Sequence, residues 1–599
     1  MKVCVVGAGP CGLTTVKQLV DEGHEVICHD HNPALGGLWL HADDDGSQTK
    51  AYDDLHLTIS MKLMAYSDFP FTGERVFYTR EQYLGYLRAY AAHFDLTRHI
   101  RFSSDVVDII RTPDSWSVTT RPARTEPTAS KTTESEPTAT EPTATEPAGT
   151  DTAETTEHFD AVAVCSGPFT TPLRDIPGLD GFTGEIVHSA EYRTSERFRG
   201  KRVLVVGLAD SGADIVRQIS DVADTATLSI RSYSYLLPRL SSATRTSDHR
   251  IVRAHHHEML RRSTPYPLQM ATFWGQSTLA KTVFLTLAVI LGILTTALAV
   301  PRVLMRRLLP RTRPPEPATN PFGEPVHPPK LDLGTLHNDA NWSLIRQWNR
   351  RSHPDSTWAQ RAIGATNVSF IPSIVSGTVA LNDAGIADST GSTVHFRDGQ
   401  AADFDAIILC TGFTTEELAI GDLRVKDGNV RNLYKHFLHP EHDGTAAFIG
   451  FVRPFSGGIP ICAEMQARYF ALVCSGTLTP PANIDERIGR EKEWEEHWTA
   501  LSPHHPESIP SQVLYLDALA AEIGCLVPMS MMLRNPRLFI QLWFGSFNQA
   551  CYRIVGPHSM GAAAVDDLYS EIVDNRREMA LRMSLLQLMP THMHPQHMM

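Results

Sequence analysis

Two glycine-rich turns are the parts of this sequence best suited to chemistry. The first spans Gly7–Gly12 (GAGPCG) after the apolar run KVCVV, and the second spans Gly207–Gly212 (GLADSG) after KRVLVV. In such turns the first glycine allows a sharp reversal, the middle position lets the backbone approach a pyrophosphate, and the last lets helix and strand pack closely. The sequence therefore predicts two dinucleotide-binding sites, although Ala209 adds a methyl group at the middle position of the second.

The residues that follow each turn distinguish the two sites. The strand-like run EVICHD ends on Asp30, where a carboxylate can accept a hydrogen bond from a ribose hydroxyl. The corresponding run ATLSIR in the second unit ends on Arg231, and Arg239 is a second candidate cation. A cation there suits the 2′-phosphate of NADP and disfavours NAD. We therefore expect one FAD and one NADPH, between which electrons pass.

Both turns need the same supporting unit of a buried strand, a helix and a second strand. The runs VAVCSG (162–167) and IILCTG (407–412) each end in a small residue and Gly, as do strands that close such sheets beside the cofactor. We therefore expect an α/β fold with two Rossmann-like dinucleotide-binding domains.

The chain resembles the flavin-containing monooxygenases over nearly its whole length. The stretches that carry the resemblance occur in the family's order, and the third is its F-x-G-x-x-x-H-x-x-x-Y/F fingerprint. They are LGGLW (35–39), YDDLHLTISMKLMAYSDFPF (52–71), FTGEIVHSAEY (182–192), NLYKHFLHP (432–440), AEMQARYF (463–470) and RLFIQLWFGSFNQACYRIVGP (537–557).

The resemblance implies a class B flavoprotein monooxygenase with its NADPH domain inserted in its FAD domain. NADPH would reduce the FAD, and a C4a-hydroperoxyflavin formed with O₂ would oxygenate a soft nitrogen or sulfur nucleophile. The protein must keep water from that intermediate. The implied FAD residues are Gly7, Ala8, Gly9, Pro10, Cys11, Gly12, Asp30, Gly37, Leu38, Trp39, Leu57, Thr58 and Ile59. The implied NADPH residues are Gly207, Ser211, Gly212, Ala213, Asp214 and Arg231.

One position departs from the family pattern. Thr58 stands where the family usually has Asn near the flavin, and a hydroxyl has a shorter reach than an amide. We take Thr58 as the catalytic candidate and expect a less durable hydroperoxyflavin that leaks more H₂O₂. A plain packing role for Thr58 is the alternative.

Further positions in the matching stretches bear on subclass and structure. Tyr192 ends the fingerprint where Baeyer–Villiger enzymes usually carry Trp, so it favours oxygenation of nitrogen or sulfur. His188 is expected to organise the linker between the nucleotide domains rather than to act as a base. Glu464 and Arg468, four residues apart on a predicted helix, could pair with each other.

The composition limits the class of protein. The chain has 599 residues, 42% of them hydrophobic, and a formal net charge of −13, which excludes wholesale disorder and disfavours nucleic acid as a partner. Its nine cysteines contain no C-x-x-C pair, which argues against a disulfide framework, a zinc ribbon and a dithiol reductase. The His run 255–257 and the tail THMHPQHMM lack the second cluster of a metal site, so we expect no metal. We also expect a cytoplasmic protein without a signal peptide.

Two segments interrupt the globular pattern. Residues 121–157 repeat the unit EPTAT and have few large apolar side chains, so we expect disorder within a loop between strands. Residues 282–300 are apolar apart from Thr, and five arginines follow at 302–313. A single bilayer crossing would separate the two parts of the FAD domain. We therefore expect monotopic association with the cytoplasmic face of a membrane, with a buried core helix as the alternative.

These observations predict an FAD domain formed by residues 1–195 and 366–575, an inserted NADPH domain at 196–365 with its apolar insert at about 270–330, and a tail at 576–599. The expected activity is NADPH- and O₂-dependent oxygenation of a small-molecule amine or sulfide. Alternatives are a Baeyer–Villiger oxygenase acting on a ketone, an NADPH oxidase that releases H₂O₂, and a membrane-docked flavoprotein with a non-catalytic or reductase role. The substrate and the oligomeric state stay open.

Overall fold

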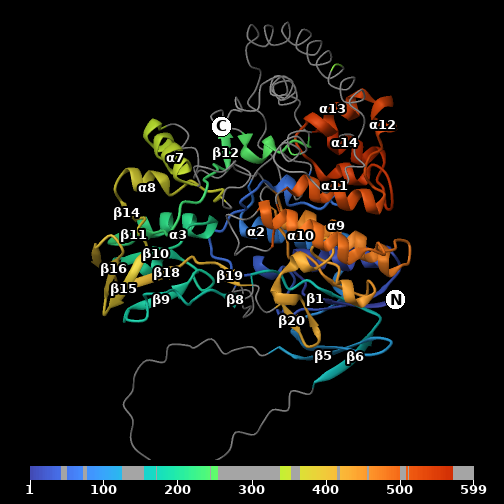
Figure 1. Cartoon of the computed structure of the whole chain (residues 1–599), viewed down its shortest axis with the longest axis horizontal. Coiled ribbons are helices and arrows are strands. Elements are labelled where there is room, and N and C mark those ends of the chain that lie inside the picture. Colours follow the sequence, from blue (N-terminus) through green and yellow to red (C-terminus); the bar gives the residue numbers. More distant parts are fainter. Residues whose placement is uncertain are drawn as a thin grey trace, which may run out of the picture.

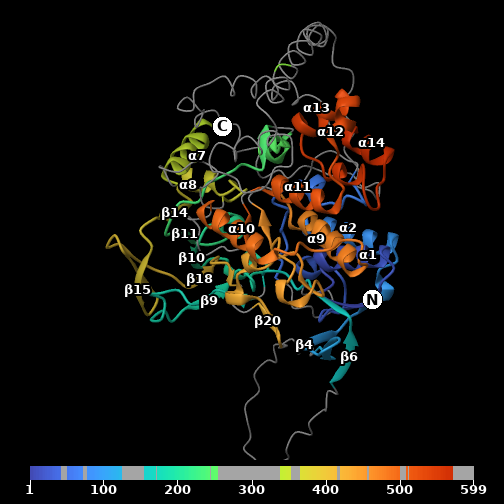
Figure 2. The same ribbon diagram turned by 45° about the vertical axis from the view of Figure 1, so that its right-hand side comes forward.

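The structure is a computed structural model (Figures 1 and 2). It describes residues 1–41, 50–71, 77–123, 154–169, 171–242, 245–253, 256, 286, 338–352, 364–414, 418–454, 457–498, 507–509 and 511–570.

The first of two five-stranded parallel sheets combines the two ends of the chain. Its order is β22-β7-β1-β2-β3, so a strand from the second half of the sequence pairs beside strands from the first. The bounds are β1 (Lys2–Val6), β2 (Glu25–His29), β3 (Ile100–Arg101), β7 (Ala161–Val164) and β22 (Ala446–Phe448). Helices α1 (Pro10–Asp21) and α9 (Ile459–Cys474) pack against each other within the same core. The two-part FAD domain follows from this pairing.

The second parallel sheet repeats the plan, with the order β14-β11-β10-β18-β9. Its strands are β9 (Glu185–His188), β10 (Arg202–Val206), β11 (Thr225–Ser229), β14 (Val379–Asn382) and β18 (Ala406–Leu409). Two parallel sheets, each with a glycine turn after its central strand, confirm the predicted fold class. Figure 1 shows the second sheet on the left and the first on the right.

The second sheet has wider limits than the predicted range 196–365. It begins with β9 and continues through β14 to β18, because the apolar runs VALN and AIIL pair in parallel with β11 and β10. The predicted return to the first domain is at residue 366. The structure places it after the last strand of this sheet.

A three-stranded antiparallel sheet corrects the prediction for residues 121–157. It comprises β4 (Ser104–Arg111), β5 (Trp116–Pro122) and β6 (Thr155–Phe159). β5 extends to Pro122 and β6 begins at Thr155, so both ends of the predicted disordered segment are strand residues. Their threonines favour strands. Residues 124–153 lie outside the described residues.

Helices and short strands complete the two domains. The helices are α2 (Arg80–His93), α3 (Asp210–Ser220), α7 (Asp339–Arg351), α8 (Ile371–Val375), α10 (Ile484–Trp498), α11 (Gln512–Ile523), α12 (Met529–Arg534), α13 (Pro536–Phe544) and α14 (Ala562–Ser570). The short strands are β8 (Thr171–Pro172), β12 (Leu240–Ser242), β13 (Arg245–Thr246), β15 (Ile386–Thr390), β16 (Thr393–Phe396), β17 (Ala401–Asp403), β19 (Phe413–Thr414), β20 (Ala419–Ile420), β21 (Leu423–Arg424), β23 (Arg453–Pro454) and β24 (Ser508–Ile509).

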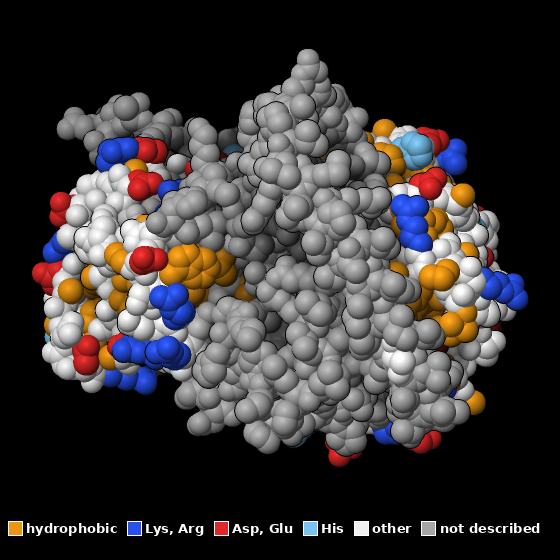
Figure 3. Space-filling view, turned by 90° about the horizontal axis from the view of Figure 1, so that it is seen from above, with side chains coloured by type: hydrophobic (Ala, Val, Ile, Leu, Met, Phe, Trp, Pro, Cys, Tyr) orange, Lys and Arg blue, Asp and Glu red, His pale blue; other side chains and the backbone are white. Residues whose placement is uncertain are grey.

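Within the described residues, no helix is long and apolar enough to cross a membrane. The predicted membrane-associated run 282–300 lies outside the described residues, apart from Thr286. On the face shown in Figure 3, hydrophobic, basic and acidic side chains of the described residues are interspersed.

A buried ion cluster joins distant segments of the first domain. The guanidinium of Arg553 is 1% exposed and lies 2.9 Å from the carboxylates of both Asp68 and Glu464. It also donates to the hydroxyl of Ser67 at 2.8 Å, and Lys17 lies 2.7 Å from Asp68. Although burial alone would raise the pKa of the Asp68 carboxyl, Arg553 and Lys17 hold it below its ordinary value. The Asp68 carboxyl is therefore ionised and pairs with the cations of this cluster.

This cluster also shows that the predicted pairing of Glu464 with Arg468 is wrong. Glu464 is occupied by Arg553, which comes from a segment far along the chain. Arg468 instead donates to the backbone carbonyls of Tyr552 and Pro557, at 3.0 and 3.1 Å. Both side chains thus fix the segment after α13 against α9.

We predict that Arg553→Met lowers the free energy of unfolding of the FAD-loaded protein by about 3–5 kcal/mol, because it leaves the buried Glu464 carboxylate without its cation and Asp68 with Lys17 alone. Thermal unfolding followed by circular dichroism measures the loss. The matched control is Arg199→Gln, which removes an exposed pair with Glu196 and should change stability by less than about 1 kcal/mol. If the two variants unfold at the same midpoint temperature, the cluster has no structural role.

Candidate dinucleotide site

A cavity of about 1450 Å³ lies between the two sheets. Residues that follow β1, β2 and β7 line it from the first domain, and residues that follow β10 and β18 line it from the second. Ligands of parallel α/β sheets bind at these carboxyl ends of the strands. The volume exceeds the roughly 300–1,000 Å³ of a pocket for one small ligand. It therefore suits two dinucleotides that meet in one space.

The first glycine turn presents backbone to this cavity. Gly7 has φ +102°, and a Cβ atom there would lie 2.9 Å from the carbonyl oxygen of Cys165, so only glycine fits. Gly9, Pro10 and Cys11 line the cavity where α1 begins. A helix N-terminus with free N–H groups is a site for a pyrophosphate.

Polar groups beyond β2 fit the adenosine part of FAD. Asp30, 4% exposed, accepts hydrogen bonds from the backbone N–H of Ala8 at 2.5 Å and of Asn32 at 2.7 Å, and lines the cavity. The Nε2 atom of His29 and the Oδ1 atom of Asn32 are buried and have no hydrogen-bond partner in the described structure. Burial lowers the pKa of His29 to about 4, so its ring is neutral. Buried polar groups normally have a hydrogen-bond partner, and a ligand in the cavity that both residues line would supply one. These residues therefore fit FAD.

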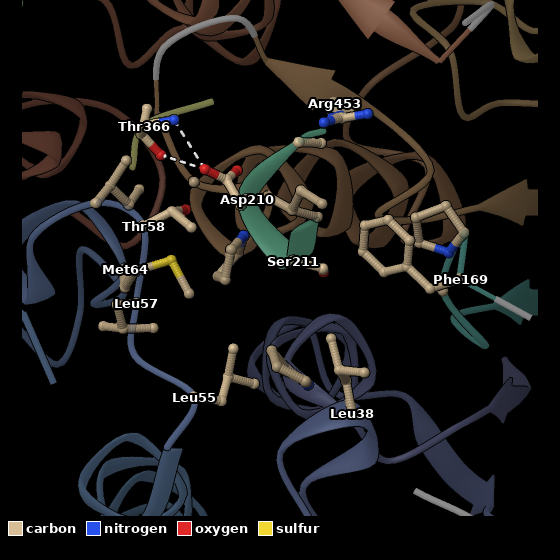
Figure 4. Close-up of a pocket in the computed structure, with 18 of the residues that line it drawn as sticks. Leu38, Leu55, Leu57, Thr58, Met64, Phe169, Asp210, Ser211, Thr366 and Arg453 are labelled. Atoms are coloured by element: carbon tan, nitrogen blue, oxygen red, sulfur yellow. Dashed lines mark hydrogen bonds between the residues drawn. The ribbon is translucent and has the colours of Figure 1, made fainter. Parts of the chain in front are cut away.

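The second glycine turn repeats this geometry beside β18. Gly207 has φ +95°, and a Cβ atom there would lie 2.6 Å from the carbonyl oxygen of Cys410. Ser211 lines the cavity at the start of α3, as does Asp210. Asp210 accepts hydrogen bonds from the N–H and hydroxyl of Thr366, at 2.8 and 2.9 Å (Figure 4). Burial raises the pKa of the Asp210 carboxyl.

Asp214 joins the two domains beside this turn. Its carboxylate accepts a hydrogen bond from the Tyr52 hydroxyl at 2.8 Å and another from the amide of Asn367. Arg239 lies 3.4 Å from the same carboxylate and is 1% exposed. Arg239 is therefore a buried partner of Asp214 rather than an available cation for a phosphate, which corrects the sequence-based expectation.

An apolar wall surrounds Thr58. In Figure 4 the side chains of Leu38, Leu57, Met64 and Phe169 lie around the same space as Thr58. All of them line the cavity. The half-buried Thr58 hydroxyl has no hydrogen-bond partner among the described residues. Such a wall excludes water from a reacting centre.

Most of the predicted site residues converge on this cavity. Those that line it are Gly7, Gly9, Pro10, Cys11, Asp30, Gly37, Leu38, Trp39, Leu57, Thr58, Ile59, Ser211 and Asp214. Those that do not are Ala8, Gly12, Gly207, Gly212, Ala213 and Arg231, of which the first five shape the two turns. Arg231 is exposed and lies beside Gly385.

Several lining residues were not identified from the sequence. They include Lys50, Asp210, Arg453 and a face of α7 that carries Arg346 and Arg350. Lys50 donates to the carbonyl of Phe169, and burial lowers its pKa to about 8. Of these, only Asp210 had a local signal, because it lies inside the second glycine turn.

His188 and Tyr192 belong to the second domain, and neither lines the cavity. The two ring nitrogens of His188 contact the carbonyl of Gly412 and the N–H of Ala190, both at 3.1 Å, so they join the segments that follow β18 and β9. The predicted role of His188 in the linker between the domains stays a prediction. Tyr192 is 1% exposed and donates to Gln218 at 2.8 Å. Tyr192 therefore packs in the core of the second domain.

Cysteine and metal chemistry have no centre in the described structure. All nine cysteines are free, and burial raises the pKa of Cys11 to about 12, so its thiol stays protonated. The described residues contain no group of three His, Cys, Asp or Glu side chains placed to hold a metal ion. His255 and His257 lie outside the described residues, and so does the tail after residue 570.

Comparisons with known proteins agree with this geometry. The family model described as "Flavin-binding monooxygenase-like" matches residues 1–277 and 341–572. A 4-hydroxybenzoate brominase (decarboxylating) from Marinomonas mediterranea is 32% identical over 572 residues, which cover 95% of this chain and 92% of that protein. Human flavin-containing monooxygenase 1 is 26% identical over 574 residues, covering 93% and 89%.

A solved structure extends the comparison to the fold. Cyclohexanone monooxygenase from Rhodococcus sp. Phi1, bound to NADP⁺, superposes with a TM-score of 0.51 at 15% sequence identity. The superposition covers 87% of this chain and 97% of that one. The shared feature is the two-domain α/β architecture.

We predict that Asp210→Asn tightens binding of NADP⁺ about fivefold at pH 8, since a carboxylate beside the α3 N-terminus repels the pyrophosphate. Asn can still accept the hydrogen bonds from Thr366. Because the pKa of Asp210 is raised above 3.8, the wild-type carboxyl loses its proton, and the protein loses affinity, as pH rises through that pKa. Calorimetric titrations at several pH values should show the two proteins converging in acid. Equal affinities at pH 8 would contradict the prediction.

Proposed function

The chain belongs to the flavin-binding monooxygenase-like family, and from that premise we propose that it oxygenates the nitrogen or sulfur of a small molecule with NADPH and O₂. It is a flavoprotein monooxygenase that uses FAD and NADPH. The observation that carries the proposal is the single cavity on which both glycine turns open. Electrons can pass between two cofactors only when their reacting ends meet.

When bound, FAD would accept electrons from NADPH and activate O₂. The residues of the chain position the cofactors and shield the reacting groups. The turn at Gly7–Gly12 and the α1 N-terminus hold an anionic pyrophosphate, and Asp30 orders that turn. Leu57, Met64 and their apolar neighbours keep water out. A soft nucleophile needs no general base here, which agrees with a His188 ring already occupied by backbone groups.

A second candidate reaction is halogenation of a phenolic aromatic acid. The observation that favours it is the sequence identity of 32% to a decarboxylating 4-hydroxybenzoate brominase, against 26% to human flavin-containing monooxygenase 1. In this chain either reaction would use the same bound FAD and NADPH. They differ in whether the activated oxygen reaches an organic nucleophile or a halide ion.

We also propose that residues 282–300 dock on a membrane surface without crossing it. The support is the uncharged apolar run followed by five arginines. Strands from before and after the run pair in both sheets, so one crossing would divide each sheet. Recovery of the full chain in the supernatant after a carbonate wash, without detergent, would contradict this proposal.

Four probes separate the candidate activities of the FAD-loaded protein: a dialkyl aniline, an alkyl aryl sulfide, a cyclic ketone, and 4-hydroxybenzoate with bromide. NADPH oxidation, O₂ uptake, H₂O₂ release and products are measured together. We predict an N-oxide or sulfoxide and reduced H₂O₂ with the first two. An ester from the ketone would indicate Baeyer–Villiger chemistry, and a bromophenol would indicate halogenation. If the amount of H₂O₂ released equals the amount of NADPH oxidised with every probe, the protein is an oxidase. If no O₂ is taken up, it is a reductase.

We further predict that Thr58→Asn lowers the share of NADPH lost as H₂O₂ by roughly two- to fivefold, an effect of about one added hydrogen bond. The amide can donate and accept toward the flavin where the Thr58 hydroxyl reaches less far. Thr58→Val is the matched control, because it keeps the shape and removes the hydroxyl. If the Asn and Val variants release the same share of H₂O₂, Thr58 has only a packing role.

A further inference from the structure

One face of α7 contributes two arginines to the cavity. Trp342, Ile345, Arg346, Asn349 and Arg350 all line it, and their spacing of three and four residues places them on a single side of the helix. An aromatic ring, an aliphatic side chain and two cations on one face fit a nucleotide base followed by a phosphate.

Hydrogen bonds hold this helix at the nucleotide end of the second sheet. The Asn349 amide donates to the carbonyl of Leu236 at 3.0 Å and accepts from its N–H at 2.8 Å. The indole of Trp348 donates to the carbonyl of Ser234 at 3.0 Å. These backbone groups follow β11, the strand after which a dinucleotide's ribose is recognised in this fold. The helix therefore approaches the position where the sequence predicted Arg231 to act.

The charges on this face lack protein partners. Arg346 and Arg350 are exposed, and neither has an ion pair or hydrogen bond within the described structure. Arg351, the next residue, is by contrast paired with Asp383 at 3.1 Å. Like charges four residues apart destabilise a helix slightly. The negative end of the helix dipole, at the C-terminus, stabilises the positive charge of Arg350. Arg346 lies more than a turn earlier, where this effect has faded. A bound anion would compensate both.

We propose that Arg346 and Arg350 bind the 2′-phosphate of NADPH and so determine the preference for NADPH over NADH. This inference rests on the proposed NADPH-dependent function. It assigns to α7 the role that the sequence analysis gave to Arg231, which is exposed and does not line the cavity. Two guanidinium groups can bind a phosphate dianion with several charge-assisted hydrogen bonds.

The test compares 2′,5′-ADP, which carries the 2′-phosphate, with 5′-AMP, which lacks it. Binding of each to the FAD-loaded full chain is measured by calorimetry, so no turnover is required. The substitutions Arg346→Gln and Arg350→Gln should each weaken the binding of 2′,5′-ADP about tenfold. Affinity for 5′-AMP should stay within about twofold, and the effect should shrink at high ionic strength. Arg351→Gln is the matched control on the same helix and should leave both affinities unchanged.

Four results would overturn the inference, and one of them also bears on the proposed function. Unchanged 2′,5′-ADP affinity in both variants would remove α7 from the site, and a loss confined to Arg231→Gln would return the role to that residue. If a variant loses affinity for 2′,5′-ADP and 5′-AMP equally, the substitution has damaged the structure rather than removed phosphate recognition. If the wild-type chain binds 2′,5′-ADP no more tightly than 5′-AMP, the NADPH preference itself fails.

Discussion

The buried guanidinium of Arg553 is the interaction on which the first domain depends. A charge in a protein interior must be compensated, so Arg553 brings together Asp68 from the N-terminal part and Glu464 from α9. In the same domain α9 packs against α1, and β22 pairs beside β7. A domain assembled from both ends of the chain can then surround an inserted second domain, with both glycine turns facing one cavity.

A second set of contacts fixes the two domains relative to each other. Tyr52 comes from the first domain, yet its ring packs in the core of the second, and its hydroxyl reaches Asp214 on α3. Asp214 therefore works as a connection between the domains, although it follows a turn whose spacing predicts cofactor binding. The same helix presents Asp210 to the cavity, so the nucleotide site and the domain contact share one element.

Local patterns predicted what depends on neighbours in sequence. The glycine turns, the strands before them and Asp30 were recognisable because a tight turn and a helix N-terminus need fixed spacing. The partners of Glu464, Arg239 and Asp214 were not, because each is set by residues far along the chain. Arg346 and Arg350 carried no local signal, since an exposed arginine pair looks the same on any helix. Their relation to the cavity depends on how Asn349 holds α7 against Leu236.

The most direct test of the account is whether bound FAD takes electrons from NADPH and returns them to O₂. The FAD-loaded chain is mixed anaerobically with one equivalent of NADPH while flavin absorbance is followed, and oxygenated buffer is then added. A shared cavity predicts rapid bleaching of the flavin by NADPH, much slower bleaching by NADH, and recovery of the oxidised spectrum only after O₂ enters. A flavin that stays oxidised in excess NADPH would contradict it, because the two turns would then not serve one reaction.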